Sequence, residues 1–174
     1  MDIATLPGVT SASSATAFDV INNRYVIRTN LGITIISAID GSILDAFSNP
    51  LNALGLHFGC ENNLVGVYWN GNEEIFTSMD LSTGSFTDLN VLPGVLFLNP
   101  NTAFDKTTNR YAISTNLGVT IVDATNGSII HNHPEDSTSR LLGLQFDCYN
   151  QLYGMYYKGQ ELMFASINIK TGAM

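Results

Sequence analysis

Hydrophobic residues in this chain fall into short runs, and clusters rich in Asn, Asp, Ser, Thr and Gly separate these runs. Short apolar runs that contain β-branched and aromatic residues and end at turn residues are typical of β-strands. No connection between two runs is long enough to hold a crossover helix, so neighbouring strands should pair antiparallel. The pattern therefore predicts an all-β chain.

The first half of the chain is predicted to contain eight strands in two groups of four. Turn signals lie between the strands, and Asp40-Gly41 is a strong signal for a tight hairpin. The predicted strands of the first group are residues 16–18, 25–28, 33–38 and 43–47, and those of the second group are residues 54–58, 64–69, 74–79 and 85–91.

The chain contains two copies of one long repeat. Thr16-Ala17-Phe18-Asp19 recurs 86 residues later as Thr102-Ala103-Phe104-Asp105, and Leu54-Gly55-Leu56 recurs 88 residues later as Leu142-Gly143-Leu144. Each copy divides again, because Phe104-Asp105 reappears 42 residues later as Phe146-Asp147. The chain thus contains four units of about 42 to 44 residues with four strands each. This repeat length is the one expected of propeller blades.

The two chain ends are in register with each other. When Gly172-Ala173-Met174 is aligned with Gly84-Ser85-Phe86, Met1 takes the place of Thr87, and the register continues without a gap to Leu6 and Leu92. The two ends would then complete one outer strand, which leaves no open sheet edge.

We therefore predict a single domain over residues 1–174, with repeat copies at about 6–91 and at 92–174 plus 1–5. It is a four-bladed β-propeller of four-stranded antiparallel blades, closed by strands from both termini. The alternatives are half of an eight-bladed propeller formed by a dimer, and a fragment of a larger propeller.

The repeated pattern of Phe-Asp, a polar turn, Asn-Arg-Tyr, a hairpin and a Gly turn covers nearly the whole chain. It resembles the blades of the β-propeller superfamily, close to the tyrosine-valine-threonine-asparagine and gluconolactonase-like repeats. The resemblance implies an architecture but not an activity, because propellers host enzymes, lectins and docking platforms alike.

Charge and hydropathy exclude two classes of partner. The net charge is −8 and the seven Lys and Arg residues are scattered, which argues against nucleic acid. No apolar run is long enough for a membrane span. The first residues lack the basic start and apolar core of a secretory signal, so no signal peptide is predicted in this chain. A signal can be removed, so the compartment stays open, and an extracellular or periplasmic location is preferred.

The first candidate ligand site is the inner strand of each unit. Four aligned phenylalanines are expected to pack between blades, so their neighbours Ala17, His57, Ala103 and Gln145 should point into a central channel. His57 and Gln145 would face each other there and could hold a water, an ion or a polar ligand group. The alternative is that they are structural polar groups satisfied through water.

The second candidate site is a repeated hairpin. Tyr68-Trp69-Asn70-Gly71-Asn72-Glu73 matches Tyr156-Tyr157-Lys158-Gly159-Gln160-Glu161. An exposed aromatic ring beside amide and carboxylate groups suits a sugar, whose apolar face stacks on the ring. We select Trp69, Asn70, Tyr157 and Glu161 as ligand-binding candidates; the alternative is that the rings are buried between blades.

Other chemistry is not predicted. His131-Asn132-His133, with Glu135 and Asp136, has metal-ligand residue types but shows no third ligand at a defined spacing, so no metal site is expected. No Gly-x-Ser-x-Gly motif or other catalytic arrangement is recognised, and no cofactor is predicted. Cys60 and Cys148 occupy equivalent repeat positions and are interpreted as two small, semi-buried thiols, with a disulfide between them as the alternative.

Three function classes follow. We favour a non-enzymatic binding or interaction module with a protein or carbohydrate ligand, acting as a monomer or as a ring-completing homodimer. The alternatives are a lactonase-like metal-dependent hydrolase and a structural or engineered repeat without a ligand.

Overall fold

The computed structural model describes residues 4–48, 54–59, 63–95, 98–133 and 141–170. These residues form fifteen β-strands in four antiparallel sheets, and no helix occurs among them. The all-β class predicted from the sequence is confirmed.

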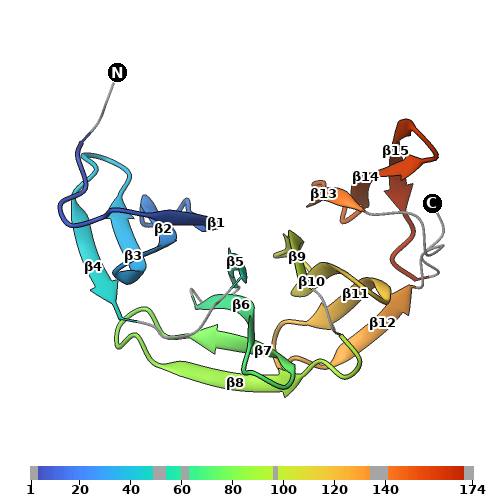
Figure 1. Ribbon diagram of the computed structural model, residues 1–174, viewed down its shortest axis with the longest axis horizontal. Helices are drawn as coiled ribbons and strands as arrows, with labels where there is room; N and C mark the ends of the chain where they lie inside the picture. The colour runs from blue at the N-terminus through green and yellow to red at the C-terminus, as the bar shows by residue number, and fades with distance from the viewer. Residues whose placement is uncertain (1–3, 49–53, 60–62, 96–97, 134–140, 171–174) are drawn as a thin grey trace.

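The first two sheets contain four strands each, in chain order from the inside of the molecule to the outside (Figure 1). The strands of the first sheet are β1 (Ala12–Asp19), β2 (Arg24–Thr29), β3 (Gly32–Ser37) and β4 (Ile43–Phe47). The strands of the second sheet are β5 (Leu54–Phe58), β6 (Leu64–Trp69), β7 (Glu74–Met79) and β8 (Phe86–Val91). All eight predicted strands are present, and four have the predicted bounds.

The other two sheets repeat this arrangement. The strands of the third sheet are β9 (Leu98–Asp105), β10 (Arg110–Thr115), β11 (Gly118–Asp123) and β12 (Ile129–His133). The fourth sheet contains β13 (Leu142–Phe146), β14 (Leu152–Lys158) and β15 (Glu161–Ile167). An outer strand equivalent to β8 is not found there among the described residues.

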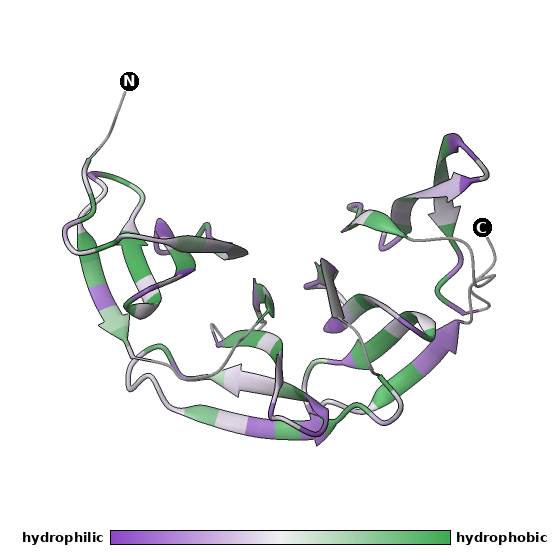
Figure 2. Cartoon of the chain, in the orientation of Figure 1, coloured by the Kyte–Doolittle hydropathy of each residue, from purple (hydrophilic) through white to green (hydrophobic). Residues whose placement is uncertain are grey.

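Local sequence explains the strand order within a blade. The middle strand β6 is almost continuously apolar because both of its faces are covered, and only Trp69 at its end is exposed. The outer strands β4 and β8 carry exposed polar residues, and Figure 2 shows hydrophilic segments on β8 and β12. At the β3–β4 hairpin Gly41 has a φ of 73°, a left-handed conformation that favours glycine, and Asp40 accepts a hydrogen bond from Ser42 N.

Three apolar clusters hold the four blades together, one between each pair of consecutive blades. The first joins β1–β3 to β5–β7, the second joins β6 and β7 to β10 and β11, and the third joins β9–β11 to β13–β15. Contacts between the inner strands β1, β5, β9 and β13 follow the same order.

The four blades follow an open arc (Figure 1). The first and fourth sheets lie at opposite ends of the arc, and among the described strands the contacts between blades join only consecutive blades. The predicted closure of four blades within one chain is therefore not confirmed, and its closing residues, 1–3 and 171–174, lie outside the described residues.

Candidate functional site

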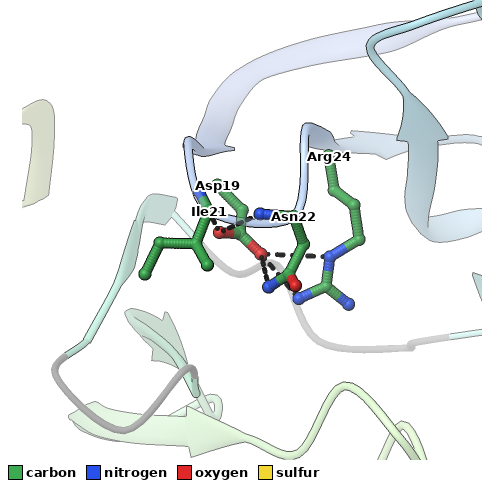
Figure 3. Close-up of polar contacts among 4 residues, drawn as sticks. All are labelled: Asp19, Ile21, Asn22 and Arg24. Carbon is green, nitrogen blue, oxygen red and sulfur yellow. Dashed lines mark hydrogen bonds and ion pairs between the residues drawn. The ribbon is translucent and has the colours of Figure 1, made fainter.

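The β1–β2 turn is built around the buried carboxylate of Asp19 (Figure 3). Its Oδ1 accepts hydrogen bonds from the backbone N–H groups of Ile21 (3.1 Å) and Asn22 (3.2 Å). Its Oδ2 accepts bonds from Asn22 Nδ2 (2.7 Å) and from the Arg24 guanidinium (2.6 Å from NH2). Burial alone would raise the pKa of Asp19, but the hydrogen bonds from Asn22 and Arg24 outweigh it and lower the pKa.

The same turn recurs in the other blades with different residues. Asp105 and Asp147 also accept turn N–H groups, from Thr107 (2.9 Å) and Tyr149 (2.8 Å). The second blade has Gly59 at this position, and a Cβ there would lie 2.3 Å from the Asn63 side chain. These carboxylates are therefore structural caps of turns.

His57 lies between the second and third blades. Its Nε2 is 3.0 Å from Thr102 Oγ1, and its ring packs against Phe104 (6.2 Å between centroids) and edge-on to Tyr111 (5.4 Å). Burial lowers the pKa of His57 to about 4, so the imidazole is neutral at pH 7. The hydroxyl of Tyr111 donates to the carbonyl of Gly55, and burial raises the pKa of Tyr111.

Gln145, the repeat equivalent of His57, has a different environment. Its side chain is exposed, and its Nε2 donates to the carbonyl of Phe146 (3.3 Å). His57 belongs to the second blade and Gln145 to the fourth, and their described contacts are separate. A role for either residue in ligand binding stays a prediction.

The expected lining of the channel is wrong at two positions. Ala17 and Ala103 are buried in the clusters between blades instead of facing a channel. Because the two faces of a blade each meet a neighbouring blade, alternate side chains of the inner strand point to these neighbours, and the strand edge faces the axis.

The hairpin candidates lie at the tips of two blades. Trp69 ends β6 with 42% of its surface exposed, and Tyr157 near the end of β14 is 45% exposed, so neither ring is buried between blades. Asn70 Oδ1 accepts hydrogen bonds from Asn72 N (2.8 Å) and Glu73 N (2.9 Å). The Asn70 NH₂ group is thus the part of this side chain that can reach a ligand.

The two tips are separate sites on one face of the arc. Glu161 is exposed, and its backbone lies opposite that of Lys158 where β14 turns into β15. Each blade connects its second and third strands by a hairpin, and the blades share one strand order, so these hairpins lie on the same face. The third blade separates the Trp69 tip from the Tyr157 tip.

Metal-ligand residue types do not gather into a site within the described ranges, where no group of three or more His, Cys, Asp or Glu side chains could hold an ion. His131 is exposed and stacks on His133, whose Nε2 is 2.8 Å from the carbonyl of Ile169. Glu135, Asp136 and Cys60 lie outside the described residues, and Cys148 is an exposed free thiol.

Sequence reasoning missed two groups. The polar contacts of Thr102, Tyr111 and Gly55 around His57 were not expected, although all three residues recur in the other copy as Thr16, Tyr25 and Gly143. Buried Glu74 was also missed: its Oε2 has no hydrogen-bond partner among the described residues, and burial raises its pKa. Its repeat equivalent is Leu162, so the repeat gives no signal for it.

No family model matches the sequence, and no curated protein matches it. Solved structures match the fold. A chain of a nidogen/laminin complex matches with a TM-score of 0.66 at 12% identity, over 94% of this chain and 62% of that chain. Putative TolB from Agrobacterium tumefaciens matches with a TM-score of 0.69 at 11% identity, over 98% and 66% of the two chains.

A luciferin-regenerating enzyme matches with a lower TM-score of 0.61 at 13% identity, over 92% of this chain and 60% of that chain. This chain thus spans less than two thirds of each of these three structures. Together with the four antiparallel sheets, the matches show that the chain has a β-propeller fold. Proteins with this fold include enzymes as well as proteins found in binding complexes, so the fold does not define an activity.

Proposed function

We propose that this chain is a non-enzymatic binding module that presents its hairpin tips to a carbohydrate ligand. The observation that carries the proposal is the exposure of Trp69 and Tyr157 at equivalent tips of a rigid scaffold. A large aromatic ring exposed beside polar groups offers a flat apolar surface for a pyranose and partners for its hydroxyls. Asn70 and Glu161 supply these polar groups.

Two equivalent tips also favour a ligand with several binding units. One aromatic ring contributes a small contact area, so a single tip should bind weakly. Two tips on one rigid face raise the effective concentration of the second site once the first is occupied. A polysaccharide or a clustered glycan is therefore the preferred ligand class.

A protein ligand is the second candidate. The structural match to a chain of a nidogen/laminin complex supports it, because that chain shares the propeller fold and was solved in a complex. The extracellular or periplasmic location expected from the sequence stays a prediction.

A glycan array with purified protein tests the carbohydrate proposal. The double variant Trp69→Ala, Tyr157→Ala should lose the signal of the unaltered chain at least tenfold, while its unfolding midpoint stays close to the original because both rings are exposed. Tyr149→Ala is the matched control: this exposed tyrosine lies in the β13–β14 turn, on the opposite face.

Two results would contradict the proposal. One is an array on which the unaltered chain retains no glycan. The other is a signal that the double variant and the Tyr149→Ala control reduce equally.

A further inference from the structure

The three clusters between blades are not all alike. The first and third clusters are repeat equivalents, because Ala17, Phe58 and Leu64 of the first correspond to Ala103, Phe146 and Leu152 of the third. The second cluster, between the second and third blades, has no equivalent among the described residues. By the repeat, the equivalent cluster would lie between the fourth blade of this chain and a first blade placed after it.

The fourth blade carries one half of that missing cluster. Val65, Val67 and Phe76 of the second blade are buried against the third blade. Their repeat equivalents in the fourth blade are Tyr153, Met155 and Phe164, which also are apolar or aromatic. Phe76 is fully buried, whereas Phe164 is 72% exposed and stacks on Tyr153 with 5.5 Å between the ring centroids.

The first blade carries the other half. The third blade contributes four residues to the second cluster, and their equivalents in the first blade are apolar as well. Each is more exposed than its equivalent, and Phe18, which corresponds to the partly buried Phe104, is 49% exposed. The residues of the third blade are Tyr111, Ile113, Val122 and Ala124, and those of the first blade are Tyr25, Ile27, Ile36 and Ala38.

The residues that make polar contacts at the joint between the second and third blades also have repeat equivalents. In the chain, His57 contacts Thr102, and the Tyr111 hydroxyl donates to the Gly55 carbonyl. The fourth blade keeps a side chain with hydrogen-bonding groups, Gln145, at the place of His57, and Gly143 has the same φ of 58° as Gly55. The first blade keeps Thr16 and Tyr25, so donors and acceptors remain on both faces.

We propose that two copies of this chain pack head to tail, the fourth blade of each against the first blade of the other, and close one eight-bladed ring. Each new joint repeats the existing joint between the second and third blades. The occupant is a second copy because the two uncovered faces are complementary to each other by the repeat. An asymmetric contact of this kind must close into a ring or continue as a filament, and the open arc lets two copies close it (Figure 1).

Sedimentation of the purified chain gives the first test. The expected species has twice the 18.8 kDa mass of one chain. Phe164→Glu places a charge on the fourth-blade side of the joint, and Phe18→Glu places one on the first-blade side. Each variant alone should be monomeric. Both side chains are exposed in the single chain, so the variants should still fold, which circular dichroism checks. Ile39→Glu, at an exposed turn outside the joint, should stay dimeric.

Mixing the two variants gives the decisive result. In a head-to-tail pair of Phe164→Glu with Phe18→Glu, one joint carries both charges and the other is unaltered. The mixture should therefore recover a dimer that neither variant forms alone. If the unaltered chain is monomeric, the proposal is overturned. The two faces would then be covered by blades from another polypeptide segment. A dimer that either variant alone retains also overturns it, because it indicates pairing of like faces.

Discussion

His57 and Gln145 occupy the same position of the repeat but have different surroundings. His57 is enclosed by Thr102, Phe104 and Tyr111 of the next blade, and burial lowers its pKa to about 4. Gln145 is exposed because no described blade follows the fourth. The chemistry of a residue in this protein therefore depends on the neighbouring blade as well as on its own.

A pH-dependent stability follows from His57. Its folded pKa of about 4 lies below the ordinary value of 6.5, so the unfolded chain binds more protons between these values. Stability due to neutral His57 is complete above pH 6.5 and is lost as the pH falls towards 4. The loss amounts to at most about 3 kcal/mol.

Urea denaturation at pH 7 and at pH 4.5 measures this effect. His57→Gln, which introduces the residue found at the equivalent position 145, removes the titrating group. The free energy of unfolding of the unaltered chain should fall more than that of the variant. Equal falls would show that His57 is not responsible.

At the scale of the element, the β1–β2 turn combines a cap with a link between blades. Asp19 holds the turn through Ile21 and Asn22, and its ion pair fixes Arg24. The Arg24 guanidinium lies 6.0 Å from the ring centroid of Phe58 in the next blade. The carboxylate thereby couples the geometry of the turn to the first joint between blades.

Asp19→Asn should destabilise the fold by about 2 kcal/mol at pH 7, because the buried acceptor of the guanidinium loses its charge. The folded pKa of Asp19 is lowered, so its contribution is present above the ordinary value of 3.8 and is lost as the pH falls below it. The difference between variant and unaltered chain should shrink in acid. Asp45→Asn, at an exposed carboxylate on β4 that accepts a hydrogen bond from Ala46 N, is the control and should have a smaller effect on urea denaturation at pH 7.

At the scale of the whole molecule, an open arc exposes two apolar faces that closed propellers bury. Exposed residues such as Phe164 and Phe18 are unfavourable in water unless another surface covers them. The strand edge of β15 has no partner among the described strands, and such an edge can pair with another chain. Assembly should therefore contribute to the stability of each copy.

The midpoint of thermal unfolding should accordingly rise with protein concentration, because association favours the folded state by mass action. Phe164→Glu should lower the midpoint and remove its concentration dependence, while Ile39→Glu keeps both. Calorimetry over a hundredfold range of concentration measures this. A midpoint that is constant for the unaltered chain would argue against assembly-linked stability.

The sequence by itself determined the strands, their turns and the two-copy repeat. Strand formation here depends on short apolar runs bounded by turn residues, so bounds such as 54–58 and 64–69 agree with β5 and β6. The repeat indicated the propeller class in the same way, because units of similar sequence and length should form similar blades. The exposed rings of Trp69 and Tyr157 were also anticipated as one of two alternatives.

Only the tertiary structure decided which surfaces meet. The rotation between consecutive blades decides three features. It decides whether Ala17 faces a channel or a neighbouring blade, and whether His57 meets Gln145 or Thr102. It also decides whether four blades close within one chain. Many small packing contacts along the joints set that rotation, and no short motif encodes it. The sequence therefore specified the blade, and packing between blades specified the arc.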